Sequence, residues 1–340
     1  MGGNALSDVG LVRLTAEAYH RFAGRTLARV REVLGADARV AAIPAYRAKP
    51  DFGDLDLLVS APDEGWGIDK PVQELLSRTF SPTRFEPNGP VLSFDTETGQ
   101  GRFQVDLIRI GWADFDFALN YYSFNDTGNL LGRVTRKMGF KLGFTGLYKV
   151  LRTPGNEAHW VKDVRVSRDW SAVLSFMGYD PDAWRAGFET REDIFRFVVS
   201  GRYFDPGSFP LESRSHANRV RDRKRPTYMA FLRWLDGRSF APGPDADRWN
   251  RPAREVFERF PDFRARWDRA ILTIEKDRLF RARFNGQRVR ELTGLEGPAL
   301  GGHLCALAGQ FDTPEDLRQF VLESSEDNLA LFLRTGCAPG

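Results

Sequence analysis

Two aspartates, Asp54 and Asp56, stand at alternate positions where an apolar run begins, in the segment KPDFGDLDLLV. Side chains two positions apart in a β-strand point to the same face, so these carboxylates would lie side by side. Carboxylates that close raise each other's pKa unless a positive charge lies between them. Mg²⁺ is commonly held by one or two carboxylates, together with water and substrate phosphates. The doublet therefore indicates a divalent-metal site, although an isolated pair of this kind is more often two solvent-facing acids at a strand end.

A third acid, Asp106, interrupts the later apolar segment FQVDLIRI, residues 103–110. Apolar residues at positions 103, 105 and 107 alternate there with a second row that contains Gln104 and Asp106. Alone, such an acid is as often a satisfied residue of an edge strand. Three acids on adjacent strands of one small sheet are typical of a two-metal site for phosphoryl chemistry.

Hydrophobic spacing predicts the elements that must position these acids. Residues 11–34 have apolar side chains at helical spacing, and Gly35 is a suitable C-cap. Four strand-like segments follow, with one helical segment at 67–79 between them: 39–43, 55–60, 91–96 and 103–110. These elements predict an α+β unit. After Trp112 we expect a largely helical chain with breaks at its proline-rich stretches.

Composition limits the classes of protein that need to be considered. The chain has 340 residues, of which 42% are hydrophobic, enough for sizeable cores. It contains no run near the roughly 18 apolar residues of a membrane span, and its N-terminus lacks a basic segment followed by an apolar one. Two cysteines and four histidines form neither a disulfide framework nor a zinc-binding spacing. We expect a soluble, cytoplasmic protein without a membrane partner.

The segments AYRAKPDFGDLDLLV and FQVDLI resemble the nucleotidyltransferase superfamily that includes DNA polymerase beta, the CCA-adding enzymes and the poly(A) polymerases. Its members have a Gly-Ser motif, a Gly-Asp-x-Asp doublet on one strand and a third Asp on a later strand. The polymerase X branch is most similar, over roughly residues 38–152. The resemblance implies a small mixed β-sheet palm with flanking helices, followed by a largely helical C-terminal region. The implied parts are an N-terminal helix (1–37), the palm (38–112), a helical thumb-like region (113–205) and a helical nucleic-acid-contacting domain (206–340).

The same resemblance implies the residues of a site. Asp54, Asp56 and Asp106 would be catalytic and would bind two Mg²⁺ ions, with Mn²⁺ as an alternative. The segments YRAKPDFG, YYSFND and KMGFKLGFTGLYKV match the branch around its nucleotide-binding residues. The implied nucleotide contacts are Arg47, Lys49, Gly53, Tyr121, Tyr122, Asn129 and Arg133. For the Tyr pair a place in the core, and for Asn129 and Arg133 a solvated helix face, are about equally compatible with the pattern.

Two segments depart from the family pattern. Pro44-Ala45 replaces the Gly-Ser motif, and proline offers no N–H to a phosphate, so we expect weaker or altered triphosphate binding. Ser123-Phe124-Asn125 replaces a Thr-Gly-Ser turn, so the sugar of the nucleotide would be contacted differently. The 37 residues before the sheet are too few for the helix-hairpin-helix domain of repair polymerases, and a gap-filling role is not expected.

The segment RSHANRVRDRKR, residues 214–225, has six basic residues and one acid, and TYMAFLRWL follows with three aromatic residues. Cations beside exposed aromatic surface favour nucleic-acid contact; the alternative is a solvated helix face. The predicted contacts are Arg214, Arg219, Arg221, Arg223, Lys224 and Arg225. The segment NGQRVRELTGLEGPALGGHLCAL is similar to the end of many proteins related to CCA-adding enzymes and poly(A) polymerases, although ordinary turn and helix-start chemistry also explains it.

The predicted function is metal-dependent transfer of a nucleoside monophosphate from an NTP or dNTP to the 3′-hydroxyl of DNA or RNA. One alternative keeps the chemistry but moves the acceptor to a protein or small-molecule hydroxyl. Another is a nucleic-acid-binding scaffold with a degenerate site, which three neighbouring carboxylates disfavour. The sequence leaves open the sugar of the nucleotide, the use of a template, the acceptor and the oligomeric state.

Overall fold

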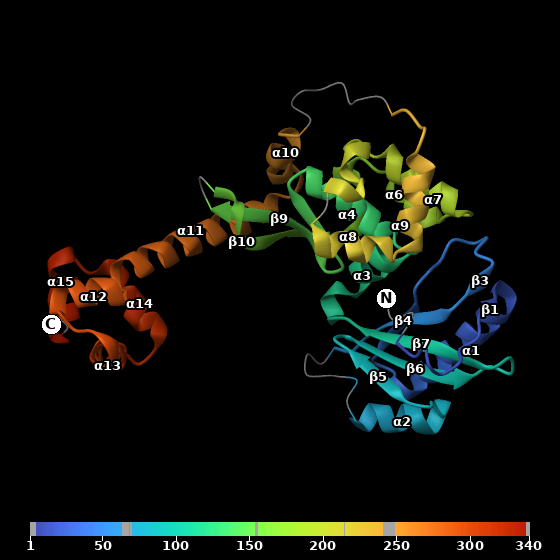
Figure 1. Ribbon diagram of the computed structural model, residues 1–340, viewed down its shortest axis with the longest axis horizontal. Coiled ribbons are helices and arrows are strands. Elements are labelled where there is room, and N and C mark those ends of the chain that lie inside the picture. Colours follow the sequence, from blue (N-terminus) through green and yellow to red (C-terminus); the bar gives the residue numbers. More distant parts are fainter. Residues whose placement is uncertain are drawn as a thin grey trace. The chain divides into compact units, whose positions relative to one another are not determined.

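A computed structural model describes residues 5–62, 68, 70–153, 156–213, 215–240 and 249–337, without the side chains of 153, 156–159 and 213. The chain divides into two compact units, Met1–Phe263 and Arg264–Gly340. The structure is α+β, as predicted, with mixed sheets in the first unit and a largely helical C-terminal region (Figure 1). The division into four parts stays a prediction.

The first unit begins with the elements that position the three acids. They are β1 (Leu14–Thr15), α1 (Ala16–Leu34), β2 (Arg39–Ala42), β3 (Asp51–Phe52), β4 (Asp54–Ser60), α2 (Lys70–Phe80), β5 (Phe85–Asn88), β6 (Val91–Glu97) and β7 (Arg102–Arg109). A second group follows: the 3₁₀ turn η1 (Trp112–Asp114), α3 (Phe115–Tyr122), α4 (Thr127–Lys137), β8 (Phe140–Gly143), β9 (Gly146–Thr153) and β10 (Asn156–Ser167). The rest of the unit is helical: α5 (Trp170–Met177), α6 (Pro181–Ala186), α7 (Arg191–Ser200), η2 (Pro206–Ser208), η3 (Leu211–Ser213), α8 (His216–Arg223), α9 (Pro226–Leu235) and α10 (Arg251–Arg259).

A five-stranded mixed sheet carries the acids, in the order β2-β4-β7-β6-β5. The β4–β7 pair is parallel, and the other three pairs are antiparallel. Because β4 and β7 are parallel neighbours, α2 and the β5–β6 hairpin form the connection between them. The four strands predicted from the sequence therefore lie in one sheet, and the structure adds β5 at its edge.

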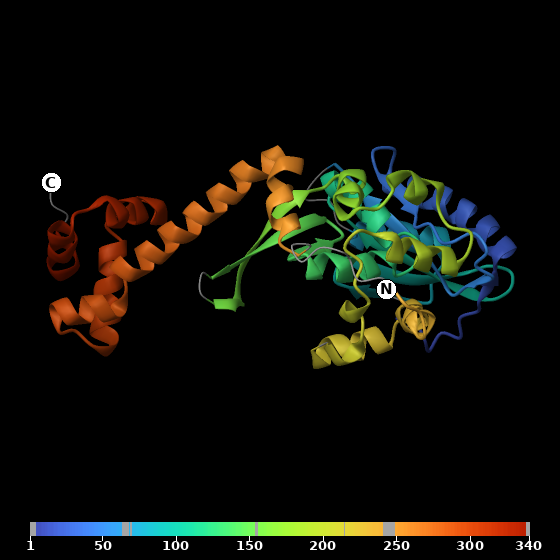
Figure 2. The same ribbon diagram turned by 90° about the horizontal axis from the view of Figure 1, so that it is seen from above.

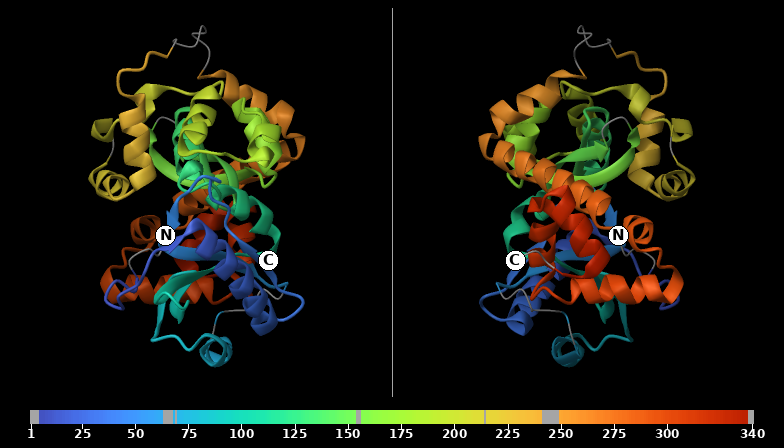
Figure 3. Two further views of the ribbon diagram at one scale, coloured as in Figure 1. Left: turned by 90° about the vertical axis from the view of Figure 1, so that its right-hand side faces the viewer. Right: turned by 90° about the vertical axis from the view of Figure 1, so that its left-hand side faces the viewer.

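The two faces of this sheet differ in chemistry because side chains alternate along each strand. One face presents Leu55, Leu57 and Val105 to a core that α1 and α2 cover. On the other face, Leu58 and Ile108 pack with the first turn of α3. The three acids lie on this second face, opposite the apolar core that α1 and α2 cover. Figure 3 shows α2 in cyan at one edge of the unit.

Helix α1 begins later than the sequence indicated, at Ala16 instead of residue 11. Leu14 and Thr15 form β1, which pairs with β3 immediately before the doublet. The Thr15 hydroxyl caps the helix by accepting a hydrogen bond from the backbone N–H of Ala18. As a consequence, the residue before β1, Arg13, is placed beside β3 instead of on a helix surface.

Three antiparallel strands, β8, β9 and β10, lie within the region that we expected to be helical (Figure 2). The expectation was wrong for residues 140–167. Phe140 and Leu142 are buried whereas Lys141 between them is exposed, which is the alternation of a half-buried strand. A tight turn then joins β8 to β9, where Gly146 has φ +145° and a Cβ atom would lie 2.6 Å from the carbonyl oxygen of Ser167. A strand in this place needs glycine there.

The second unit is helical, and Figure 3 shows its helices in orange and red. Helix α11 (Pro261–Arg283) leads into α12 (Gly286–Thr293), α13 (Gly297–Ala308), α14 (Pro314–Glu323) and α15 (Glu326–Thr335). Val289, Leu307 and Phe332 are the centre of its apolar core. The segment that resembles the family's C-terminal end forms α12 and α13, joined by a turn with Gly294 in the left-handed conformation. Within the described residues of the chain, no helix is long and apolar enough to cross a membrane.

Candidate metal centre

The parallel pairing of β4 with β7 brings the three acids together. Asp56 lies directly opposite Asp106, and Asp54 lies opposite Gln104. One carboxylate oxygen from each of the three aspartates falls within 4.8 Å of the other two. The doublet and the third acid, 50 residues apart in the sequence, therefore form a single cluster, as the alternation of side chains predicted.

Two oxygens of this cluster are shielded from water and have no donor. Asp106 is fully buried, and its Oδ1 accepts a hydrogen bond of 2.8 Å from Nε2 of Gln104. Its Oδ2 and Oδ1 of Asp56 make no hydrogen bond within the described part of the chain. Buried oxygens are almost always hydrogen-bonded in native proteins, so two unpaired oxygens in one cluster indicate a place for a cation.

Burial and mutual repulsion change the proton affinity of these groups. Burial raises the pKa of Asp56 to about 7, and the negative charges of Asp54 and Asp106 add to the rise. Burial also raises the pKa of Asp106, with a smaller contribution from the charge of Asp54. A cation between the carboxylates would reverse both effects because it favours their ionised forms.

The donor set suits a hard divalent cation. Three carboxylates offer only oxygen ligands, which Mg²⁺ and Mn²⁺ prefer, and no thiolate or imidazole that would favour zinc is among them. A fourth acid on the same sheet shows the contrast: Asp95 is fully buried, but its oxygens accept hydrogen bonds from Thr83 and pair with Arg102. Asp95 is therefore a structural acid, whereas the three clustered aspartates have oxygens available for a metal.

Positive side chains border the acids. The Nζ of Lys49 lies 4.2 Å from the ring centroid of Phe52. Burial lowers the pKa of Lys49, and the charges of Asp54 and Asp56 partly oppose that effect. Arg13 pairs with Asp51, and its Nη1 occupies the space over Gly53, 2.7 Å from where a Cβ atom would be. Glycine in this position leaves room for the guanidinium, which lies over the residue that precedes Asp54.

Arg13 is a candidate that the sequence analysis missed. It stands 41 residues before Asp54, inside a segment interpreted as helix. Its only signal was the apolar and β-branched pair Leu14–Thr15 that follows it, which is too short to identify a strand. The pairing of β1 with β3, which precedes the doublet, is a tertiary contact that the local sequence does not reveal.

Arg47, a predicted nucleotide contact, is engaged elsewhere in this structure. Its Nε forms an ion pair of 2.8 Å with Glu189, and its Nη1 donates to the carbonyl of Ala186 at 2.9 Å. The backbone N–H of Arg47 also donates to the carbonyl of Phe188. Arg47 thus joins the loop before β3 to the loop between α6 and α7, and the ion pair is exposed enough to exchange partners.

Tyr121 and Tyr122 end α3 with their ring centroids 5.4 Å apart. Tyr122 stacks on Phe144 of the β8–β9 turn. Burial raises the pKa of the Tyr122 hydroxyl, and the charges of Tyr121 and Asp56 add to that rise. Tyr122 therefore contacts the three-stranded sheet and lies near enough to Asp56 for the charge of that carboxylate to affect it.

Asn129 and Arg133, on α4, both line a groove between α4 and α8. Arg133 is 6% exposed, and its Nη2 forms an ion pair of 3.2 Å with Asp222 of α8, which is 1% exposed. Asn129 is half-buried on the same helix face. The guanidinium of Arg133 is therefore engaged with α8.

The close packing of α4 against α3 gives a first prediction. A Cβ atom on Gly128 would lie 2.1 Å from the carbonyl oxygen of Tyr121, which is too close for any real contact. Gly128→Ala should force α4 away from the Tyr pair and lower the melting temperature of the protein by several degrees. Gly132→Ala, on the same helix with its nearest neighbour at 3.8 Å, is the matched control. Equal melting temperatures for the two variants would contradict this packing.

Helix α8 contains three of the six predicted nucleic-acid contacts. Arg221 and Arg223, with Lys224 after the helix, are exposed, whereas Arg219 and Arg225 are half-buried. Arg225 forms an ion pair of 3.1 Å with Asp126. Arg214 lies outside the described residues.

The aromatic residues after α8 are not the exposed surface that we expected. Tyr228 and Phe231 of α9 are completely buried, and the Tyr228 hydroxyl donates to the carbonyl of Phe209. Trp234 stacks on Phe231 and is half-buried. The expectation was wrong because the apolar face of α9 packs into the core of the unit.

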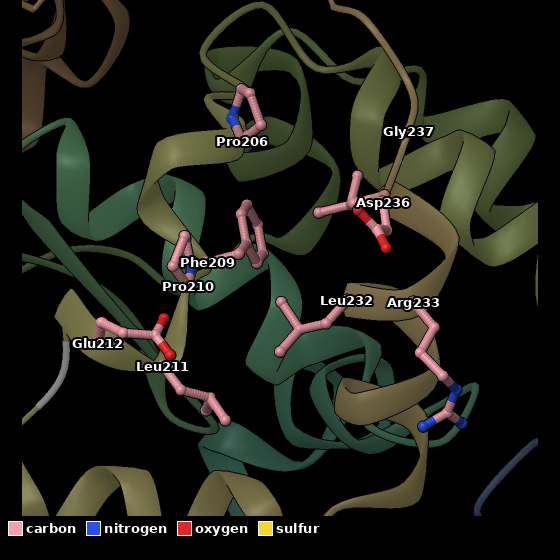
Figure 4. A pocket seen from close by; sticks show the side chains of 10 residues that line it. Pro206, Phe209, Pro210, Leu211, Glu212, Leu232, Arg233, Asp236 and Gly237 are labelled. Atoms are coloured by element: carbon pink, nitrogen blue, oxygen red, sulfur yellow. The ribbon is translucent and has the colours of Figure 1, made fainter.

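A shallow apolar cavity of about 450 Å³ lies between η2, η3 and α9 (Figure 4). Phe209 and Leu232 project into it, and Glu212 and Arg233 stand at its border. None of the three clustered acids or the predicted nucleotide contacts lines it.

No protein-family model matches the chain, and no curated protein matches it.

Proposed function

We propose that this protein is a metal-dependent nucleotidyltransferase related to the polymerase X branch of the DNA polymerase beta superfamily. One observation carries the proposal: three carboxylates lie within 4.8 Å of one another, and two of their oxygens are buried without a donor. Such a site costs stability unless a cation binds there. The resemblance in sequence around the same three acids indicates that such a cation would take part in nucleotidyl transfer.

In this proposal, Asp54, Asp56 and Asp106 hold Mg²⁺. When bound, the metal would lower the pKa of an attacking hydroxyl and neutralise the charge of the leaving pyrophosphate. Lys49 and Arg13 bind phosphate oxygens beside the acids, in place of the serine hydroxyl and the backbone N–H that Ala45 and Pro44 do not supply. Gln104 fixes the orientation of the Asp106 carboxylate through its hydrogen bond.

A transfer assay tests the proposal. The pure protein is incubated with Mg²⁺ or Mn²⁺, with each labelled NTP and dNTP, and with single-stranded RNA, primed DNA or no nucleic acid. Asp54→Asn should reduce transfer at least about a hundredfold, the size of effect found for single electrostatic contributors. Asp37→Asn, which changes an exposed acid outside the cluster, should leave the rate unchanged.

Each outcome has a clear meaning. Elongation of one polymer that depends on Asp54 supports the proposal and identifies the sugar. Label on protein or a small molecule that depends on Asp54 keeps the chemistry and moves the acceptor. Transfer that is equal in Asp54→Asn and the wild type would remove the acids from the reaction.

A further inference from the structure

A groove of about 600 Å³ lies among α4, the β8–β10 sheet and α8, apart from the acid cluster. These elements can be located in Figure 1. Four cationic side chains from these elements line it and are exposed: Arg136, Lys141, Arg152 and Arg221. The buried Arg133 lies in its floor. The walls of the groove thus come from segments far apart in the sequence that all contribute positive charge.

The acid among the described lining residues of the groove is already paired. Asp163 is the single acid of that described set, and it accepts hydrogen bonds from Lys141 at 2.6 Å and from the indole of Trp160 at 2.8 Å. By contrast, Arg136 makes no side-chain hydrogen bond or ion pair among the described residues. The excess of cations over acids favours an anionic ligand.

Aromatic side chains accompany the cations. Trp160 is 57% exposed, which is unusual for a tryptophan and leaves its ring accessible. Tyr121 lines the other side of the groove, and its neighbour Tyr122 borders the acids. The groove therefore combines a row of cations with an exposed aromatic ring, the two features that bind single strands.

We propose that this groove binds a single-stranded nucleic acid, with its phosphates at Arg136, Arg152 and Arg221 and an unpaired base stacked on Trp160. Its volume is that of a site for a compact ligand, so it admits one or two nucleotides and not a duplex. Stacking on Trp160 also requires a base that is free of its partner. The inference that the groove holds the acceptor strand rests on the proposed function. Binding of nucleic acid to the groove, however, is measured without the transfer reaction.

Fluorescence anisotropy of a labelled single-stranded oligonucleotide, with a duplex of the same length for comparison, tests this proposal. EDTA is present and nucleotide is absent, so the acid cluster plays no part. The double variant Arg136→Ala/Arg221→Ala should weaken binding at least about tenfold. It should also reduce the slope of log K against log salt concentration by about 1.4, the value for two lost phosphate contacts on a single strand. Trp160→Ala should weaken binding by roughly 5- to 150-fold, and Trp160→Phe by less.

Two controls distinguish the groove from general charge. Arg25→Ala removes an exposed cation of α1, and Lys70→Ala/Arg78→Ala removes two exposed cations of α2 that do not line the groove. Both should bind within twofold of the wild type. Equal loss in the control and groove variants, or equal affinity for duplex and single strand, would overturn the proposal. If the groove variants bind the oligonucleotide as the wild type does while transfer still requires Asp54, the proposed role of the groove is wrong and the proposed function stands.

Discussion

Asp222→Ala is expected to lower the free energy of unfolding of the Met1–Phe263 unit by about 3–5 kcal/mol, the cost of removing one partner of a buried ion pair. Arg133 and Asp222 are 6% and 1% exposed, so the guanidinium would remain in a site that water does not reach. Urea unfolding followed by tryptophan fluorescence measures the loss. Hydrogen exchange of α8 peptides should show that the helix opens more often.

Two variants make this prediction specific. Glu189→Ala breaks the Arg47–Glu189 pair, which is exposed on both sides and should contribute about 1 kcal/mol or less. The double replacement Arg133→Met/Asp222→Leu fills the same space without charge and should recover much of the lost stability. A loss for Asp222→Ala no larger than that for Glu189→Ala would show that α8 is not anchored by this pair.

The second large effect concerns pH and metal. Without metal, the stability of the protein should fall between about pH 4 and pH 7 because Asp56 has a pKa of 3.8 in an ordinary environment and about 7 in the fold. In that window the folded state binds more protons than the unfolded state, so each rise in pH favours unfolding. A change of this size in pKa corresponds to roughly 4 kcal/mol at most. Above pH 7 the contribution of Asp56 is constant.

Mg²⁺ should act in the opposite direction. It binds the ionised carboxylates, so its stabilising effect should be small at pH 5 and large at pH 8. Melting temperatures recorded at both pH values, with Mg²⁺ and with EDTA, measure this difference, and about 1 kcal/mol corresponds to roughly 2–4 °C.

Asp56→Asn isolates the role of the cluster. It should remove most of the decline in stability above pH 4 and most of the response to Mg²⁺. Asp37→Asn should behave like the wild type because Asp37 is exposed and outside the cluster. A response to Mg²⁺ that persists in Asp56→Asn would place the ion elsewhere.

The strand that bears the doublet, and the acid that completes the cluster, could be predicted from local sequence. Alternation of two residues places Asp54 and Asp56 on one face, and the same alternation places Asp106 opposite the core face of β7. Local spacing is sufficient here because a strand determines the direction of its side chains. The pairing of these strands was a further inference from the three acids together.

Long-range contacts explain most of what could not be predicted. Asp222 was read as the single acid in a basic run, but it turns inward to Arg133, which is 89 residues earlier. Arg13 lies over Gly53, next to Asp54 in the sequence, because β1 pairs with β3. In both cases, packing between distant segments determines the partner of a charged side chain. The spacing of residues along the chain does not predict that partner.

The β8–β10 sheet and α9 show a different limit. Short apolar segments such as FKLG fit a helix or a strand, and only the neighbouring strands decide between them. In α9, an aromatic row was interpreted as surface because basic residues precede it. Burial of Tyr228 and Phe231 follows from the position of that helix in the unit.

The parallel β4–β7 pair also has a consequence for the synthesis of the protein. Asp56 leaves the ribosome 50 residues before Asp106, and at 5–20 residues per second that interval lasts roughly 3–10 s. During this time α2 and the β5–β6 hairpin emerge, but β4 has no parallel partner. Under the proposed function, the nascent chain therefore holds two of the three acids before the metal site is complete, and Mg²⁺ would stabilise this part of the protein only after β7 has joined the sheet.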